Sequence, residues 1–203
     1  MPGDCALNYS TVTATSANTN APSNWNLPNV LTVLRIIGVP VFLWVLLQDG
    51  GESSYWRWWA FAVFALLMAT DKLDGHLARS RNLITDFGKI ADPIADKALM
   101  LAALVGLNII GLLPWWITAI IVVREGGITI WRMLALRQGR VVPASKGGKL
   151  KTVMQSLAVA LFLAPLPWLY WPAWAVMIVA VVITVVTGIQ YILDSREAGK
   201  VSD

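Results

Sequence analysis

Residues 56–78 read WRWWAFAVFALLMATDKLDGHLA, and this stretch has the pattern of a membrane span. Its tryptophans gather at the start, its middle is apolar, and its acids fall near the end. A helix needs about 20 mostly apolar residues to cross the hydrocarbon core of a bilayer. We therefore expect a transmembrane helix here, with tryptophans at one membrane face and carboxylates at the other.

Five more apolar segments of similar length accompany this one. The six expected helices cover residues 30–48, 56–78, 91–112, 115–136, 150–170 and 172–193. The chain of 203 residues is 57% hydrophobic and 14% charged, whereas a soluble domain carries about 25% charged residues. We expect an all-α integral membrane bundle of six transmembrane helices, forming one domain over residues 25–203. Pro40, Pro93 and Pro165 fall inside or near the ends of these segments, where we expect kinks or shifted boundaries.

The first 24 residues differ in composition from the rest of the chain. They are rich in Ser, Thr, Asn and Ala, and they lack the basic start and apolar core of a secretory signal peptide. We expect residues 1–24 to form a disordered polar tail. Cys5, which lies in this stretch, is the one cysteine of the chain, so a fold held by internal disulfides is excluded.

Basic residues are distributed unevenly between the two sides of the expected bundle. Lysines and arginines crowd the 72–97 junction, the 132–151 loop and the C-terminal end, whereas the three opposite loops contain only Arg57. By the positive-inside rule, both termini are expected to be cytoplasmic, in a multi-pass protein of the inner (cytoplasmic) membrane. Tryptophans near the sparsely charged side are expected to form an interfacial belt: Trp56, Trp58, Trp59, Trp115, Trp116, Trp168, Trp171 and Trp174. With this hydropathy, the net charge of +4 indicates an anionic membrane surface and no nucleic acid partner.

Five of the twelve acids fall between positions 71 and 96, beside apolar segments. Asp71 and Asp74 share one helix face, and Asp92 and Asp96 share a face of the next helix. If the two helices face each other, four carboxylates surround one point, where mutual repulsion raises their pKa values unless cations bind. Mg²⁺ and Mn²⁺ prefer oxygen ligands, so the pattern predicts a divalent metal site.

The alternative interpretation is a set of helix-end acids paired with nearby lysines, namely Lys72, Lys89 and Lys97. Against it, the intervening residues suit a ligand. Gly75 and Gly88 lack a Cβ atom and permit close approach, and Ala78 leaves space beside the carboxylates. Arg79 is placed to pair with a phosphate oxygen.

The run DKLDGHLAR at 71–79, followed by Gly88, Asp92 and Asp96, resembles the motif of the CDP-alcohol phosphatidyltransferase family, D-x2-D-G-x2-A-R-x8-G-x3-D-x3-D. All eight fixed positions are present at the family's spacing. NLPN at 26–29 and GKLKT at 148–152 are similar to stretches of the phosphatidylglycerophosphate synthases within that family. The resemblance covers residues 26–193.

This resemblance implies transfer of a phosphatidyl group from CDP-diacylglycerol to sn-glycerol 3-phosphate, with release of CMP. It implies a pair of Mg²⁺ or Mn²⁺ ions, with Asp96 also acting as the general base. The implied metal ligands are Asp71, Asp74, Asp92 and Asp96. The implied CDP-binding positions are Asp71, Asp74, Gly75, Ala78, Arg79 and Gly88, with Asn29 and Arg35 near the diphosphate. Members of the family are commonly homodimers, so a second copy of the chain is an expected partner. Membrane lipids are expected partners as well.

A phosphorylated acceptor needs cations beyond the metals. Arg124 lies in an expected span, where an arginine without an anion is costly. Glu125 is expected to be a poor partner for it, because adjacent residues do not share a helix face. The candidates for binding the acceptor phosphate are Arg124, Lys146, Lys149 and Lys151. For the lysines, binding of anionic lipid head groups is the alternative.

Other functions fit parts of the same pattern. Within the family, the acceptor is alternatively phosphatidylglycerol, which gives cardiolipin, or inositol phosphate. A cation transporter would carry acids near mid-membrane on several spans, often in repeated halves. The acids of this chain instead crowd one cytoplasmic junction, where water-soluble substrates reach the site.

Overall fold

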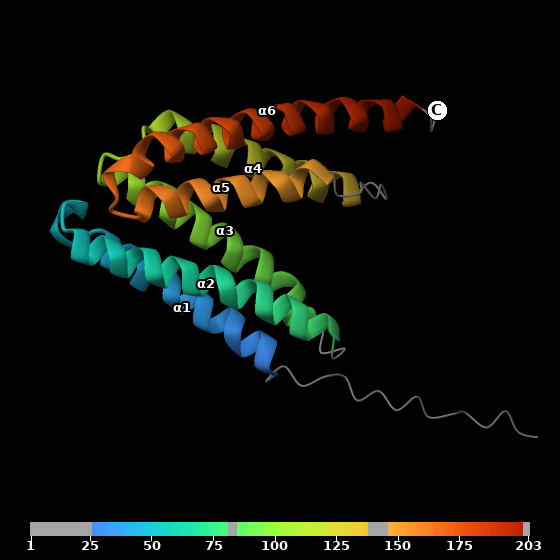
Figure 1. Ribbon diagram of the computed structural model, residues 1–203. Coiled ribbons are helices and arrows are strands. Elements are labelled where there is room, and N and C mark those ends of the chain that lie inside the picture. Colours follow the sequence, from blue (N-terminus) through green and yellow to red (C-terminus); the bar gives the residue numbers. More distant parts are fainter. Residues whose placement is uncertain (1–25, 81–84, 138–145, 201–203) are drawn as a thin grey trace, which may run out of the picture.

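The computed structural model describes residues 26–80, 85–137 and 146–200 (Figure 1). Its α-helices are α1 (Leu27–Leu46), α2 (Ser54–Ser80), α3 (Asp86–Ile109), α4 (Trp115–Arg137), α5 (Lys146–Leu163) and α6 (Tyr170–Lys200). Two short 3-10 helices, η1 (Gln48–Gly51) and η2 (Pro167–Leu169), lie between them. No strand occurs within these ranges, which confirms the all-α prediction. The expected polar tail, residues 1–24, lies outside the described residues.

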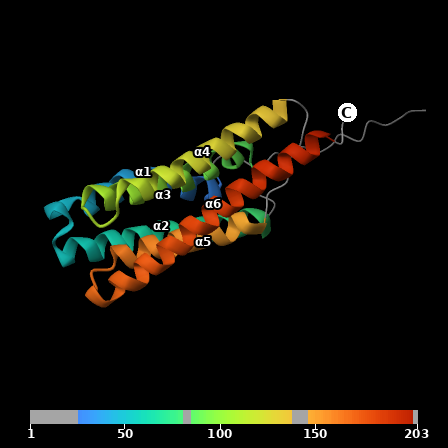
Figure 2. The same cartoon turned by 90° about the horizontal axis from the view of Figure 1, so that it is seen from above.

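Successive helices run in alternating directions, and α1, α2 and α3 are inclined to α5 and α6 (Figures 1 and 2). α1 packs along α2 and α3, and α5 packs along α6, while α4 contacts both α3 and α6. Two described segments, Leu27–Leu46 and Pro167–Ile192, are long and apolar enough to cross a membrane. A crossing by the other four helices, and the orientation of the bundle, stay predictions.

Large apolar side chains fill the middle of the bundle. The most deeply buried of them are Phe42, Leu46, Phe64, Leu99, Leu104, Leu107, Ile117, Ile121, Leu163 and Met177. Small residues bring α1 close to its neighbours: a Cβ atom on Gly38 would lie 2.7 Å from Leu67 of α2, and one on Gly106 of α3 would lie 2.6 Å from Leu46. Glycine therefore permits the close packing of α1 that positions the site.

The fifth helix was expected over residues 150–170, and this range is wrong at both ends. α5 begins at Lys146 and ends at Leu163, before Pro165. Proline has no backbone N–H and cannot continue the helical hydrogen bonding, so η2 separates α5 from α6. Arg57 of α2 donates to the carbonyl oxygens of Phe162, at 2.7 Å, and Ala164, at 3.4 Å. These bonds satisfy carbonyl groups that a helix end leaves unpaired.

The tryptophans expected at one interface gather around the loops that join α1 to α2, α3 to α4 and α5 to α6. Six of them are exposed: Trp58, Trp59, Trp115, Trp116, Trp168 and Trp171. Trp56 and Trp174 instead pack against the apolar core. These loops lie at the opposite end of the bundle from the end of α2 and the start of α3 (Figure 1).

Candidate active site

A buried arginine connects the carboxylates of α2 and α3. Nη1 of Arg35 lies 2.8 Å from Oδ1 of Asp71 and 3.4 Å from Oδ1 of Asp96. The Arg35 side chain is fully buried, whereas 27% of the Asp71 side chain and 50% of the Asp96 side chain are exposed. The structure thus brings one acid of each expected pair to a common cation. Arg35 was expected near a diphosphate, and here it contacts carboxylates.

Asp92 and Gly88 are positioned by polar groups of α1. Oγ1 of Thr32 donates to Oδ1 of Asp92 at 2.5 Å. Nδ2 of Asn29 donates to Oγ1 of Thr85 at 2.8 Å, and Thr85 in turn caps α3 by accepting from the backbone N–H of Gly88 at 3.1 Å. Asn29 therefore joins the start of α1 to the start of α3.

Thr32 is a site residue that we did not assign a role from the sequence. Asn29, Thr32 and Arg35 recur every third residue, which places them on one face of α1. All three are buried although α1 is otherwise apolar. This polar stripe is the signal that identifies Thr32, because buried polar groups in an apolar helix need partners.

Four further expected site residues continue α2 beyond Asp71: Asp74, Gly75, Ala78 and Arg79. Their side chains lie outside the described part of the structure, as do those of Lys146 and Lys149 at the start of α5. Among the side chains that are described, no three acidic, histidine or cysteine groups form a metal site by themselves. The four-carboxylate site stays a prediction that requires Asp74.

A second charged cluster joins α4, α5 and α6. Oε1 of Glu125 accepts from Nη1 of Arg124 at 2.9 Å and also from Nζ of Lys151. Nη2 of Arg124 donates to Oγ1 of Thr187 on α6 at 2.9 Å. The expectation that Glu125 is a poor partner for Arg124 is wrong. The rule that adjacent residues do not share a helix face describes only the direction of the Cβ atoms. The side chains of Arg124 and Glu125 are long enough to contact each other from different faces.

Lys97, which was considered as a partner for the acids, donates to Oγ1 of Thr129 on α4 at 2.6 Å. That hydroxyl donates to the backbone carbonyl of Glu125 at 2.7 Å. Lys97 therefore lies between the carboxylates of α3 and the cluster of Glu125 and Lys151, and it adds positive charge to that side of the site.

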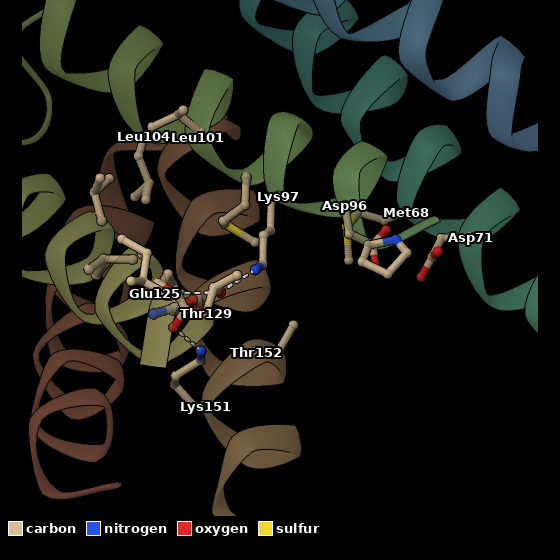
Figure 3. Close-up of a pocket in the computed structure, with 17 residues that line it drawn as sticks. Met68, Asp71, Asp96, Lys97, Leu101, Leu104, Glu125, Thr129, Lys151 and Thr152 are labelled. Atoms are coloured by element: carbon tan, nitrogen blue, oxygen red, sulfur yellow. Dashed lines mark hydrogen bonds and ion pairs between the residues drawn. The ribbon is translucent and has the colours of Figure 1, made fainter. Parts of the chain in front are cut away.

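One cavity of about 560 Å³ connects the two charged regions. Asp71 and Asp96 lie on one side of it, and Glu125 and Lys151 lie on the other (Figure 3). Its walls are otherwise mostly apolar, with Met68, Met100, Leu101, Leu104, Ile121, Val122 and Ile130 among the lining residues. Arg124 is not among the described residues that line it. The cavity thus offers acids, two lysines and apolar walls to one ligand.

Comparison with known proteins identifies the family. The model of the CDP-alcohol phosphatidyltransferase family matches residues 25–186. The chain belongs to this family. It is a transferase of phospholipid biosynthesis, and its apolar helices and its family together indicate a membrane protein.

Curated relatives carry names within the same family. A probable phosphatidylglycerophosphate synthase of Mycobacterium tuberculosis is 51% identical over 141 residues, covering 70% of this chain and 67% of that protein. The CDP-diacylglycerol–glycerol-3-phosphate 3-phosphatidyltransferase of Bacillus subtilis is 41% identical over 153 residues, covering 70% and 79%. A cardiolipin synthase (CMP-forming) of Streptomyces coelicolor is 40% identical over 119 residues, covering 58% and 54%.

Proposed function

We propose that this transferase moves the phosphatidyl group of CDP-diacylglycerol to sn-glycerol 3-phosphate, giving phosphatidylglycerophosphate and CMP. The observation that carries the proposal is the cavity that lies between the acids of α2 and α3 and Lys151 of α5. A phosphate on the acceptor explains a lysine on the wall opposite the acids. The names of the relatives from M. tuberculosis and B. subtilis support the same acceptor.

The carboxylates are proposed to hold a pair of Mg²⁺ or Mn²⁺ ions, with Asp71, Asp74, Asp92 and Asp96 as ligands. Asp71 and Asp96 offer oxygen donors, converge on one guanidinium and reach the cavity, which suits a hard divalent ion. Such ions would neutralise the diphosphate and polarise the reacting phosphorus. Arg35 keeps the two acids together by balancing part of their charge.

In the proposed reaction, the free primary hydroxyl of sn-glycerol 3-phosphate attacks the phosphatidyl phosphorus. A new P–O bond forms, the P–O bond to CMP breaks, and CMP leaves with that electron pair. Asp96 accepts the hydroxyl proton, since its half-exposed carboxylate reaches the cavity and Arg35 orients it. Gly75, Ala78, Arg79 and Gly88 are proposed to line the CDP moiety.

Lys151, which lines the cavity, is proposed to bind the acceptor phosphate directly. Arg124, which does not line the cavity among the described residues, is proposed to support it, and Lys146 and Lys149 of the same helix as Lys151 are proposed to add positive charge. The apolar walls are proposed to accommodate acyl chains that enter from the bilayer. The site is proposed to lie at the cytoplasmic face of the inner membrane, because lysines and arginines crowd the parts of the sequence that follow α2 and α4.

Synthesis of cardiolipin from phosphatidylglycerol is the second candidate, because the S. coelicolor relative is named a cardiolipin synthase. Its acceptor is a lipid whose phosphate is a diester with one negative charge. The two candidates therefore differ in the need for a cation that binds a free phosphomonoester.

The deciding experiment measures CMP release by the purified chain in nanodiscs with CDP-dioleoylglycerol. Glycerol 3-phosphate, phosphatidylglycerol and inositol phosphate are offered separately, with Mg²⁺, with Mn²⁺ or with EDTA. We expect release with glycerol 3-phosphate alone, and its loss in EDTA. Release only with phosphatidylglycerol or inositol phosphate would replace the proposed acceptor, and full activity in EDTA would contradict the metal site.

A further inference from the structure

Glu125 is an acid on the basic side of the cavity, where its negative charge would repel a bound phosphate. Its side chain is 30% exposed and lies on the cavity wall, while those of Arg124 and Lys151 are 14% and 5% exposed. An acid facing an anion-binding region costs affinity through like-charge repulsion unless it does something else there. Its hydrogen bonds indicate what that is.

Glu125 is the middle of a chain of contacts that crosses three helices. Thr187 of α6 accepts from Arg124 of α4, Arg124 donates to Glu125, and Glu125 accepts from Lys151 of α5. Thr187 is itself held by a 2.7 Å hydrogen bond from Oγ1 to the carbonyl oxygen of Ile183. Lys151 is thereby tied, through one carboxylate, to a fixed point on α6.

We propose that Glu125 is a positioning residue for the acceptor, which holds the ammonium group of Lys151 at one place on the cavity wall. The inference rests on the proposed function, in which Lys151 binds the phosphate of the acceptor. Lysine has a flexible four-carbon side chain with several rotamers, so its affinity for an anion depends on what restrains it. Glu125 supplies that restraint before the acceptor arrives, which lowers the entropy lost on binding.

The contribution of Arg124 is then indirect. Arg124 is not among the described residues that line the cavity. Its guanidinium group balances the charge of Glu125 and holds the Glu125 side chain in place. With two cations and one carboxylate, the cluster keeps one net positive charge for the acceptor. A carboxylate paired with Lys151 alone would leave none.

The test is a double-mutant cycle on the Michaelis constants of both substrates. Lys151→Met should raise the KM for glycerol 3-phosphate about tenfold, as expected for loss of a hydrogen bond to a charged group. Glu125→Gln should raise the same KM about fivefold to tenfold, while the KM for CDP-diacylglycerol and kcat stay within about twofold. Because Glu125 acts through Lys151, adding Glu125→Gln to Lys151→Met should not raise this KM further.

Two further variants separate positioning from a general structural role. Glu125→Asp keeps the charge on a shorter side chain and should recover part of the loss. Glu52→Gln is a matched control, because it makes the same chemical change at an exposed acid far from the cavity, beside η1. Thermal unfolding in detergent checks that each variant is folded, because Arg124 loses its carboxylate partner in Glu125→Gln and in the double variant.

The outcomes distinguish the two proposals. An unchanged KM for glycerol 3-phosphate in Lys151→Met would overturn the proposed acceptor site. Three outcomes would each overturn the positioning role. The first is a KM that rises in Lys151→Met but not in Glu125→Gln, and the second is additive effects in the cycle. The third is a parallel rise in the KM for CDP-diacylglycerol. A lower KM in Glu125→Gln would show that Glu125 only competes with the acceptor.

Discussion

The two charged regions of the cavity are built with opposite signs. Between α1, α2 and α3, one buried cation, Arg35, contacts the acids Asp71 and Asp96. Between α4 and α5, one carboxylate, Glu125, contacts the cations Arg124 and Lys151. Each region keeps an excess of one charge and uses a single opposite charge to fix its geometry. The comparison explains how one cavity can attract cations at one side and an anion at the other.

The largest expected effect comes from neutralising the proposed base in the acidic region. Asp96→Asn should lower kcat by about 10²–10⁴-fold, since a general base acts in the transition state. The KM for glycerol 3-phosphate should change little, because the acceptor phosphate is proposed to bind in the other region. The measurement is CMP release at saturating substrate, with Glu52→Gln as control. Normal turnover in Asp96→Asn would remove Asp96 from the chemistry.

Removing the central cation of the acidic region should affect stability as well as activity. Arg35→Met leaves Asp71 and Asp96 without their shared partner and should lower the free energy of unfolding by about 1–3 kcal/mol, because both carboxylates are partly exposed. Mg²⁺ should raise the melting temperature of this variant more than that of the wild type, because the ion replaces the lost positive charge. Thermal unfolding in EDTA and in Mg²⁺ measures both quantities. Equal shifts of the melting temperature in the variant and the wild type would mean that Arg35 does not affect metal binding.

A methyl group at Gly88 tests how rigidly α1 and α3 hold the acidic region. An added Cβ atom would lie 2.9 Å from Oδ1 of Asn29 and 3.7 Å from Oδ2 of Asp92. Gly88→Ala should therefore destabilise the fold by about 1–3 kcal/mol and lower kcat. Its KM for glycerol 3-phosphate is the internal control and should stay close to that of the wild type. An unaltered kcat would mean that the contact between Asn29 and Thr85 tolerates displacement.

The smallest effect is expected from the matching change in the basic region. A Cβ atom on Gly188 of α6 would lie 3.2 Å from Cγ of Arg124, whose flexible side chain can shift. An off-rotamer side chain costs about 0.5–1.5 kcal/mol, so Gly188→Ala should raise the KM for glycerol 3-phosphate about twofold to tenfold. Steady-state kinetics with varied acceptor measures this. A change in kcat alone would contradict the proposal that the basic region binds the acceptor while the acidic region carries the chemistry.

Much of this architecture follows from local sequence patterns. Apolar segments of spanning length predicted the six helices, and the error at α5 arose where Pro165 falls inside an otherwise continuous apolar stretch. The spacing of Asp71 and Asp96 within the family motif identified two acids that the structure brings to one guanidinium. The contact between Arg124 and Glu125 was mispredicted, because the rule on helix faces considers only the direction of the Cβ atoms. The further partners of this pair, Lys151 and Thr187, come from other helices.

The sequence by itself determined the helical class, the membrane character, the family and the residues that carry the charge, since these depend on composition, periodicity and spacing along one segment. Tertiary structure decided which charges meet. Arg35 contacts acids from α2 and α3, and Glu125 contacts a base from α5. Those partners are set by how closely whole helices pack, which depends on glycines such as Gly106 and on the summed burial of many apolar side chains. No single stretch of the chain contains that information.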